Sequence, residues 1–484
     1  MDQQKSGAQI SRKAFFQSLI ILLVLMILAG ILTLVIPAGS YSRSQTDGLE
    51  FIDPDSFQYI DRPVYPVWRW LTAPVEVLWK SENSLTIIVI IIFLLLVGAA
   101  FAVLDKSGII MSVIARIVKL FGDRKYLLLM VISFFFMAIG AFFGIFEEVI
   151  PLIPIMLALS YYLGWDSLVG LGMSILATNM GFSAAITNPF TIGISQQIAG
   201  LPTFSGTWLR IIIFICMYSV FSIFLVTYAK KIEKKPESSS VYKEDQEQRL
   251  KYNKLDLSTL NTGKDLKKAM LFFLVFLLLI FATLFGSPFI PAISGLALPL
   301  VGILFFIGGI GAGLLSKTPA KEIWQAAREG LVGISPGIPL ILMAASIKFI
   351  ADSGGIMDTI LHSASQVFSN VSPFLGAVLI YMLALIIEFF IGSATAKAFL
   401  LMPILLPLGD LVGVTRQVSV TAYCFGDGFS NLAYPTNPVL LIALGLTVVS
   451  YPKWMKWSLK LWGWVLLVTL FFLWIGVRIG YGPF

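Results

Sequence analysis

The sequence predicts an all-α polytopic membrane protein with two inverted repeats, and three observations carry this prediction. Hydrophobic residues make up 57% of the 484 residues and charged residues only 13%, about half the usual share in soluble proteins. The apolar residues form long runs such as 85–104 and 270–285, and a membrane-spanning helix needs roughly 20 of them. Finally, short motifs of the first half of the chain recur in the second half.

Charge and composition argue against several classes of protein. The formal net charge is +7, but the basic residues lie in loops beside apolar runs, which indicates membrane orientation rather than nucleic-acid binding. Cys216 and Cys424 lie in apolar stretches, so a disulfide framework is not expected. A single histidine, His362, argues against a His-rich metal site. We therefore expect no metal or organic cofactor and no nucleic-acid partner, beyond a coupling Na+ or H+.

The N-terminal part of the chain sets the orientation. Lys5, Arg12 and Lys13 precede the first apolar run, so we expect a cytoplasmic N-terminus and a first helix at about 17–37. No cleavage site of the A-x-A type follows that run, and it is read as a membrane helix rather than a signal peptide. The acid-rich loop 38–83 carries three tryptophans, which suits the outer surface of a membrane.

The chain then returns to the cytoplasm and reaches an ambiguous stretch. A second helix at about 84–104 leads inward, and 107–121 has the pattern of an amphipathic helix lying along the membrane. Residues 126–163 fit either two full spans or a re-entrant hairpin, with both ends cytoplasmic in either case. Their middle, 140–148, is interrupted by glycines and carries two glutamates, which is tolerated only where the turn is buried in protein.

A broken helix and a linker complete the first half. Residues 166–199 are too long for one straight span, and the stretch from Asn179 to Pro189 predicts a break in mid-membrane. A helix at about 208–229 leads back to the cytoplasm. The linker 230–268 carries eleven Lys and Arg and seven Asp and Glu, so it divides the first repeat, 1–229, from the second half, 269–484.

The second half repeats this plan and brings the total to about nine spans plus two hairpins. Its predicted elements are helices near 269–286, 296–316 and 331–351, an amphipathic piece at 355–368, a second hairpin at 373–411, a second broken helix at 416–447 and a last helix at 457–478.

The recurrence of Thr-Asn-Pro supports this duplication. Thr187-Asn188-Pro189 and Thr436-Asn437-Pro438 are separated by 249 positions, and Pro154 matches Pro403 at the same offset. Charge placement sends helix 84–104 inward and its counterpart 331–351 outward, so the repeats are inverted and 269–286 is a surplus helix. Inverted repeats with broken helices are typical of secondary transporters.

Both Thr-Asn-Pro motifs are candidate ion-binding or broken-helix sites. Proline frees a backbone carbonyl one turn earlier, and broken helix ends offer carbonyl and N–H groups to ions. Asn188 and Asn437 add amide oxygens, Thr187 and Thr436 add hydroxyls, and Asn179 precedes the first break. A packing kink with local hydrogen bonds is the alternative interpretation.

Charged residues mark the two predicted hairpin tips as candidate substrate sites. Glu147 and Glu148 lie in the first, and buried carboxylates are costly unless a partner or a proton neutralises them. Lys397 follows the small residues Ser393 and Thr395 in the second tip, where it either binds a substrate carboxylate or forms a structural ion pair.

The second broken helix adds further candidates. Asp427 lies between two glycines and is followed by Asn431, and we include both among the substrate-binding candidates. Glu388, about nine residues before the second tip, ranks lower. The sequence has no zinc-binding H-E-x-x-H motif and no phosphate-binding lysine loop, so we expect a transporter driven by solute or ion gradients rather than an enzyme.

Several of these motifs resemble one known family. The stretches 144–148 (GIFEE), 198–202 (IAGLP), 407–417 (PLGDLVGVTRQ) and 425–430 (FGDGFS), with Thr187-Asn188-Pro189, are similar to those of YfcC-type proteins. These proteins belong to the C4-dicarboxylate anaerobic carrier (DcuC-like) family, in a wider superfamily of ion transporters. The resemblance covers nearly the whole chain. Lys397 stands where the family pattern leads us to expect a glutamine.

The resemblance implies a bacterial inner-membrane carrier, a homodimer whose hairpins and broken helices move as an elevator. It leaves open which small charged organic solute is carried. Because acidic candidates outnumber Lys397, we favour an amino acid, with arginine–ornithine-type exchange of a basic one as the leading case. A Na+- or H+-coupled C4-dicarboxylate carrier is the alternative, and a channel is a further one.

Overall fold

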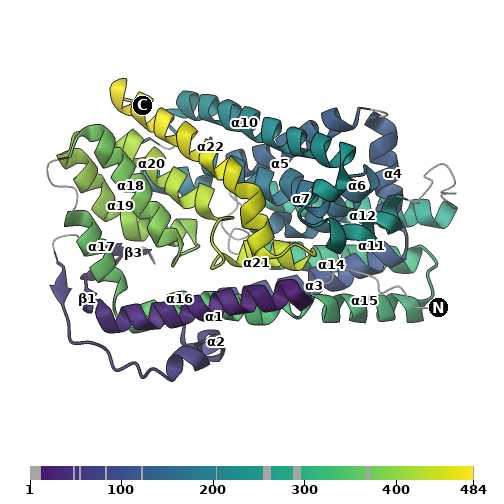
Figure 1. Ribbon diagram of the computed structural model, residues 1–484, viewed down its shortest axis with the longest axis horizontal. Coiled ribbons are helices and arrows are strands. Elements are labelled where there is room, and N and C mark those ends of the chain that lie inside the picture. The colour runs from purple at the N-terminus through teal and green to yellow at the C-terminus, as the bar shows by residue number, and fades with distance from the viewer. Residues whose placement is uncertain are drawn as a thin grey trace.

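The computed structural model shows a helical protein in which some long helices run along the long axis and others cross it obliquely (Figure 1). It describes residues 12–46, 49–53, 56–81, 84–121, 124–202, 204–253, 263–286, 296–366 and 371–482. Within these ranges, nine helices are long and apolar enough to cross a membrane. The all-α polytopic fold expected from the sequence is thereby confirmed, and residues 1–11, which include Lys5, lie outside the described part.

The outer helices expose large apolar side chains, as expected for a surface that contacts lipid. These helices are α1 (Arg12–Val35), α10 (Thr207–Lys234), α12 (Lys264–Gly286) and α22 (Tyr451–Arg478). Examples of exposed side chains are Val24, Ile223, Leu271 and Phe471. So many exposed large apolar side chains on one set of long helices are unusual for a soluble protein.

One edge of the molecule is formed by α1 and α16 (Gly337–Ser353), which lie side by side, with α2 (Arg69–Lys80) packed on them (Figure 1). The contact of α1 with α2 depends on Gly30, because a Cβ there would lie 2.3 Å from the indole ring of Trp70. Helix α2 falls in the loop that the sequence analysis left without helices.

Helix α3 (Ser84–Lys106) joins this edge to α14 (Ala297–Leu315) and to α15 (Ala320–Ile334). A Cβ on Gly330 of α15 would lie 2.2 Å from the carbonyl oxygen of Gly98 in α3, so the two backbones touch. Helix α12, the surplus helix of the sequence analysis, packs on α14.

The prediction of a single helix near 331–351 places its start at the wrong residue. The chain instead forms α15 and α16, which meet at Ser335 and Pro336. Polar residues such as Lys321 and Arg328 lie along α15, and this mixed composition hid the helix from a search for apolar runs. The last helix, α22, likewise begins at Tyr451 rather than near 457 because Tyr451-Pro452 opens it.

The stretch 126–163 turns back on itself. After α4 (Ile109–Phe121), it forms α5 (Lys125–Phe143), a 3-10 turn η1 (Glu147–Leu152) and a short α6 (Ile153–Tyr162). The rings of Tyr126 and Trp165, at its two ends, have centroids 6.0 Å apart. We call this segment hairpin 1, and its tip is 144–148.

The first broken helix follows directly. It consists of α7 (Ser167–Leu171), a π-helical stretch η2 (Gly172–Leu176), α8 (Ala177–Ala184), a second π-helical turn η3 (Pro189–Gly193) and α9 (Ile194–Ile198). The break between α8 and η3 begins at Ala185, whose φ of 44° is left-handed, and the first Thr-Asn-Pro ends it, with Pro189 opening η3.

The second half shows the same order of elements. They are α17 (Met357–Ser365), α18 (Pro373–Glu388), α19 (Ala394–Leu411), α20 (Arg416–Ser430) and α21 (Pro438–Gly445). Helices α18 and α19 form hairpin 2, with its tip at 389–393. Each hairpin packs its first helix against the neighbouring broken helix, α5 on α8 and α18 on α20.

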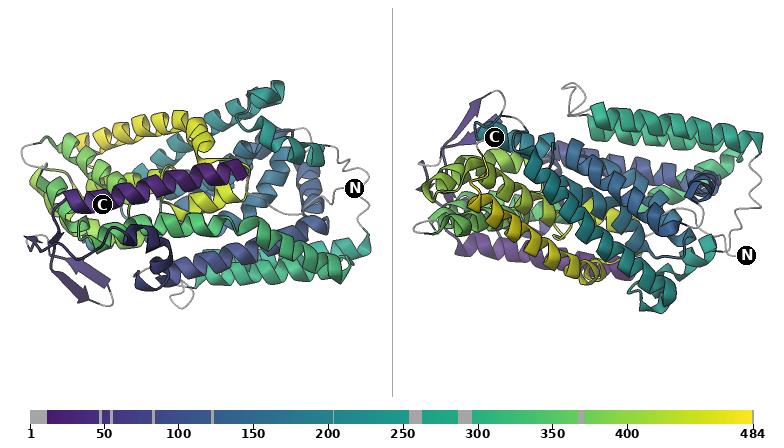
Figure 2. Two further views of the ribbon diagram at one scale, coloured as in Figure 1. Left: turned by 60° about the horizontal axis from the view of Figure 1, so that its bottom comes forward. Right: turned by 90° about the horizontal axis from the view of Figure 1, so that it is seen from above.

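Glycines permit both of these helix contacts. A Cβ on Gly181 of α8 would lie 1.7 Å from the Met137 carbonyl oxygen, and one on Gly426 of α20 would lie 2.5 Å from that of Tyr381. The long helices α10 and α22 lie next to each other and extend over this hairpin region (Figure 2, right). The tip of hairpin 1 lies next to the first break, where Gly144 faces Asn188, whereas Gly392 and Ser393 in the tip of hairpin 2 are exposed.

The remaining described parts lie at the two ends of the long axis. At one end, short antiparallel pairs form between β1 (Gly39–Ser40) and β4 (Gln58–Tyr59), and between β2 (Arg43–Thr46) and β3 (Leu49–Ile52). At the other, the linker folds into η4 (Pro236–Ser238) and α11 (Tyr242–Asn253), with α11 packed on α6. Linker residues 254–262 lie outside the described part.

Candidate functional site

The tip of hairpin 2 carries charges at helix ends that disfavour them. Glu388 is the last residue of α18, and Lys397 lies in the first turn of α19. The helix dipole favours cations at C-termini and anions at N-termini, so both residues have the unfavourable sign. Something other than the helices must therefore stabilise the two charges.

That stabilisation comes from a cluster of three buried charges. The Nζ atom of Lys397 lies 2.8 Å from an Oδ1 of Asp427 in α20, and it also forms an ion pair with Glu388. None of the three residues is more than 2% exposed. Apart from this lysine, neither carboxylate has a hydrogen-bond partner in the described part of the chain. Two carboxylates thus share one ammonium group, and the cluster has a formal charge of −1.

The tip of hairpin 1 adds two more carboxylates. Glu147 and Glu148 open η1, both partly buried, and Glu148 accepts a 3.2 Å hydrogen bond from the Phe146 N–H. Asp427 lies close enough for its charge to act on Glu147. The two hairpins and α20 therefore present four carboxylates and one ammonium group to the same region.

The first Thr-Asn-Pro ties the first break to hairpin 1. The Asn188 side chain accepts a 2.9 Å hydrogen bond from the Phe190 N–H and donates one of 3.3 Å to the Phe182 carbonyl. Its amide thus caps the helix that begins at Pro189. The Thr187 hydroxyl donates a hydrogen bond to the Phe142 carbonyl at 2.9 Å, which connects the motif to the end of α5.

The second motif caps α21 in the same way. The Asn437 side chain accepts a 2.9 Å hydrogen bond from the Val439 N–H and donates one of 3.1 Å to Asn431. Within the described residues, the hydroxyl of Thr436 is buried without a hydrogen-bond partner. Capping by both asparagines is therefore visible in the geometry, while ion binding by the motifs stays a prediction.

Asn179 lies where the two broken helices approach each other. Its amide is fully buried, and neither its oxygen nor its nitrogen has a partner among the described side chains and backbone. One turn further along α8, Ser183 packs against α20, because a Cβ on Gly428 would lie 2.5 Å from the serine hydroxyl. Gly428 directly follows Asp427, so α8 passes beside the charged cluster.

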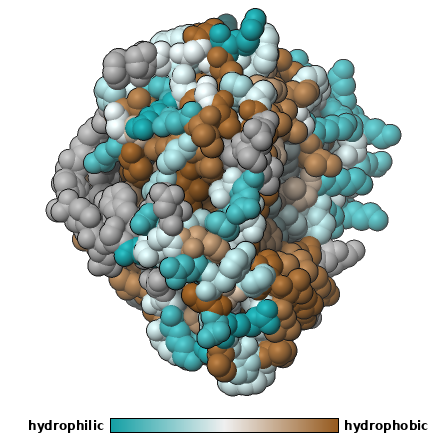
Figure 3. Space-filling model, turned by 90° about the vertical axis from the view of Figure 1, so that its left-hand side faces the viewer, coloured by the Kyte–Doolittle hydropathy of each residue, from teal (hydrophilic) through white to brown (hydrophobic). Residues whose placement is uncertain are grey.

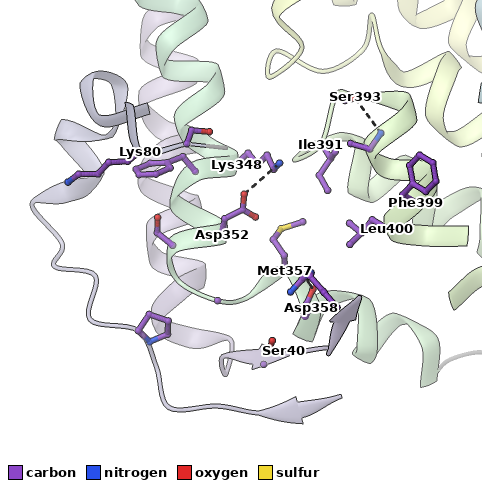
Figure 4. A pocket seen from close by; sticks show the side chains of 18 of the residues that line it. Ser40, Lys80, Lys348, Asp352, Met357, Asp358, Ile391, Ser393, Phe399 and Leu400 are labelled. Atoms are coloured by element: carbon purple, nitrogen blue, oxygen red, sulfur yellow. Dashed lines mark hydrogen bonds and ion pairs between the residues drawn. The ribbon is translucent and has the colours of Figure 1, made fainter. Parts of the chain in front are cut away.

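A cavity of about 780 Å³ opens beside the hairpin 2 tip (Figure 4). Hairpin 2 contributes Ser393 and Thr395 to its wall, and Ser393 also caps α19 through the Ala396 N–H. The other side of the cavity comes from α16, where Lys348 and Asp352 form a 3.7 Å ion pair, and from the loops around β1 and α2. The cavity thus separates hairpin 2 from the α1–α16 edge, at the end of the molecule whose surface mixes hydrophilic and hydrophobic side chains (Figure 3).

Comparison with known proteins gives this arrangement a family. The C4-dicarboxylate anaerobic carrier family (DcuC) matches residues 15–478, which is nearly the whole chain. The chain belongs to this carrier family. The resemblance inferred from the sequence motifs is confirmed, and the protein is a member of a family of membrane transporters.

Two relatives in curated collections match this DcuC-family chain along almost all of their length. A protein of Escherichia coli (strain K12) named "Putative basic amino acid antiporter YfcC" is 29% identical, over 95% of each chain. An uncharacterized protein of Haemophilus influenzae is 26% identical, over 93% of this chain and 94% of its own.

Two solved transporter structures also align with it. The Alcanivorax borkumensis YdaH transporter has 17% sequence identity and a TM-score of 0.43, and the alignment covers 97% of this chain and 100% of that one. Neisseria gonorrhoeae MtrF has 18% identity and a TM-score of 0.39, and the alignment covers 95% of this chain and 94% of that one.

The structure of this DcuC-family protein also contains a buried arginine to which the sequence analysis gave no role. Arg210 of α10 donates hydrogen bonds to the carbonyl of Ile186 at 3.1 Å and to that of Ser205 at 2.8 Å. It therefore supports the backbone at the first break. Gln196 and Gln417, joined at 3.0 Å, link the two broken helices nearby. In the sequence, Arg210 near the start of α10 looks like an ordinary arginine at a membrane interface, so its role in the interior could not be recognised.

One short motif of the DcuC-family chain also occurs in hydrolases. Residues 333–337 match G-x-S-x-G, but they join α15 to α16 rather than a strand to a helix, and the Ser335 hydroxyl donates to the Val332 carbonyl at 3.0 Å. Among the described residues, no group of three His, Cys, Asp or Glu side chains is arranged to hold a metal ion.

Proposed function

We propose that this protein is a secondary antiporter that exchanges basic amino acids across the bacterial inner membrane. The observation that carries the proposal is the excess of buried negative charge at the hairpin tips, where Glu388 and Asp427 share only Lys397. Buried charges without a partner are costly, so a region of this kind favours a cationic ligand. The name of the E. coli relative points in the same direction.

A guanidinium or ammonium side chain fits this region chemically. Guanidinium groups form paired hydrogen bonds with carboxylates, and Glu147 and Glu148 are partly exposed beside Asp427. A substrate such as arginine would bring one positive side chain to Asp427, with Glu147 and Glu148 beside it. Its own carboxylate would have to lie further toward the small polar residues Ser393 and Thr395 on the cavity wall.

The C4-dicarboxylate alternative meets an electrostatic obstacle. Its substrate brings two negative charges toward a region that already has more carboxylates than cations. Lys397, the cation that would have to receive a substrate carboxylate, is already bound to Asp427 at 2.8 Å and to Glu388. Like charges at short range in a low-dielectric environment repel strongly. A C4-dicarboxylate would therefore require protonation of several of these acids.

We further propose an elevator-like movement, a homodimer and a cytoplasmic N-terminus. The movement is supported by the separation between the α1–α16 edge and the hairpins, with the cavity between them. A channel is disfavoured because Lys397, Glu388 and Asp427 are buried in ion pairs with one another rather than lining an open pore.

The test is exchange in proteoliposomes. Uptake of labelled arginine and labelled succinate is measured with and without an internal pool of the same unlabelled solute, and with and without a Na+ gradient. Arginine uptake that needs internal arginine or ornithine supports the proposal. Succinate uptake driven by Na+, with no arginine uptake, would refute it, and solute efflux that does not saturate would indicate a channel.

A further inference from the structure

The charged cluster raises a question that goes beyond the choice of substrate. If Glu388 and Asp427 were ionised without Lys397, two negative charges would lie in the protein interior with no hydrogen-bond donor among the described residues. Such an arrangement is strongly unfavourable, and a bound cation would normally offset it. In this chain the offsetting cation is a covalently attached side chain.

We propose that Lys397 is a tethered cation that occupies the position of a coupling ion and yields it to a cationic substrate. In the substrate-free protein the ammonium group offsets one of the two negative charges of Asp427 and Glu388, so transport needs no inorganic cation. The proposal rests on the function proposed above in one respect, that the substrate is cationic.

The position of Lys397 favours this role over a purely structural ion pair. The residue lies in the first turn of α19, where the helix dipole disfavours a cation, so its own helix does not stabilise it there. Lysine carries its charge at the end of a flexible stem with four carbons, which allows the ammonium group to withdraw while the helix stays in place. A rigid structural pair would require neither feature.

Independence from inorganic cations then follows from charge compensation. A hairpin that moves with neither Lys397 nor a substrate cation at the two carboxylates carries a buried net charge of −2, whereas either cation lowers this charge to −1. An arriving cation and Lys397 compete for the same two carboxylates. The net charge of −1 that remains with Lys397 bound explains why a further cation is attracted at all.

The first experiment measures cation binding without transport. The Lys397→Ala and Lys397→Gln variants are purified, and their melting temperatures are compared in Na+ and in N-methyl-D-glucamine at equal ionic strength. We expect Na+ to raise the melting temperature of both variants, by on the order of 5 °C at saturation, and to leave the wild type unchanged. Lys106→Ala, which removes only an exposed ion pair with Glu322, should behave as the wild type does.

A double variant tests whether the carboxylates create the Na+ response. Lys397→Gln combined with Glu388→Gln restores the wild-type formal charge of −1, so its melting temperature should depend much less on Na+. If Na+ stabilises neither single variant, including the case in which neither folds in Na+, the proposal is wrong. It is equally wrong if the wild type responds to Na+ as strongly as the variants do.

A transport measurement separates this proposal from the proposed function. We expect arginine exchange by Lys397→Ala to require Na+, with activity on the order of tenfold higher in Na+ than in N-methyl-D-glucamine, while wild-type exchange is the same in both. If the wild type carries no arginine, the proposed function fails, but the melting experiment still decides the role of Lys397. If arginine exchange is present and Lys397→Ala shows no Na+ dependence in either assay, only the tethered-cation proposal fails.

Discussion

Gly144 fixes the tip of hairpin 1 against the first break of the helix. Its φ of 68° lies in the left-handed region, and a Cβ there would lie 2.2 Å from the Asn188 side-chain oxygen. Gly144→Ala should therefore destabilise the protein by roughly 1–2 kcal/mol from the backbone alone, and by more from the clash. The measurement is the melting temperature of the purified protein, together with arginine exchange.

The matched control is Gly463→Ala in α22, where a Cβ meets no atom within 4 Å. Because alanine favours helices more than glycine does, this control should be neutral or slightly stabilising. Equal melting temperatures for the two variants would mean that the tip does not rest on Asn188.

Asp427 connects the hairpin 2 cluster to the broken helix, and its neutralisation should weaken cation binding. Asp427→Asn changes the formal charge of the cluster from −1 to 0, so the attraction for a basic amino acid falls. We expect the arginine Kd, measured from the rise in melting temperature with added arginine, to increase by roughly tenfold or more. Asp410→Asn removes a surface ion pair with Arg416 and should change the Kd little. An unchanged Kd for Asp427→Asn would place the cation elsewhere.

The sequence allowed part of this cluster to be predicted. Lys397 and Asp427 stood out because charges in apolar runs are rare and usually functional. Glu388 ranked too low, because the nine positions that separate it from Lys397 do not reveal that a hairpin brings the end of one helix next to the start of the next. Only the fold shows that all three charges meet.

Among the elements, the broken helices were predictable and their local geometry was not. The two Thr-Asn-Pro motifs marked both breaks correctly, because proline and asparagine are ordinary signals for the start of a helix. The π-helical turns η2 and η3 have no comparable signature in the sequence. Helix α15 was missed because membrane spans were sought as long apolar runs, and α15 carries several polar residues. Its packing on α3 depends instead on the glycine pair Gly330 and Gly98.

The linker helix α11 docks on α6 and on the start of the broken helix through a buried carboxylate. Asp245 accepts hydrogen bonds of 2.8 Å from the Tyr161 hydroxyl and from both the N–H and the hydroxyl of Ser167. Burial, and then the charge of Asp166, raise the pKa of Asp245 to about 7. Arg249, on the same face of α11, donates to the Gly164 carbonyl at 2.8 Å.

Docking of α11 should therefore weaken as the pH rises. The raised pKa means that docked Asp245 holds its proton where free Asp245, with an ordinary pKa of 3.8, has lost it. The resulting stabilisation is complete below about pH 4 and is lost as the pH rises through about 7. Amide hydrogen exchange of 242–253, corrected for intrinsic rates, should be slower at about pH 5.5 than at about pH 8. Asp245→Asn should remove this difference, and a difference that persists in the variant would assign it to another group.

The whole molecule places its cavity at one end of the long axis, between hairpin 2 and the α1–α16 edge (Figure 4). The distribution of charge along the sequence predicts which side of the membrane this end faces. The loop 38–83 and the segment 352–372, both assigned to the outside, contribute Lys80 and Asp358 to the cavity wall. The opposite end carries Lys317 and Lys321, which are assigned to the cytoplasm.

An accessibility experiment tests this orientation. Ala396 is exposed on the cavity wall, and Ala320 is exposed beside the lysines at the other end. Each is replaced by cysteine in a background that carries Cys216→Ser and Cys424→Ala, and intact cells are treated with a membrane-impermeant maleimide. We expect Ala396→Cys to react in intact cells, because the charge distribution predicts a cavity that opens outward, and Ala320→Cys to react only after permeabilisation.

Added arginine extends this experiment to the movement of the molecule. If hairpin 2 carries its site across the membrane against a fixed α1–α16 edge, exchange conditions reduce the time that Ala396→Cys spends facing outward, so its labelling slows while that of Ala320→Cys does not change. A cavity that keeps its labelling rate under exchange would argue for a fixed outer vestibule and against an elevator. The reverse pattern of labelling in intact cells would invert the orientation derived from the lysines, and with it the direction from which Lys397 meets the substrate.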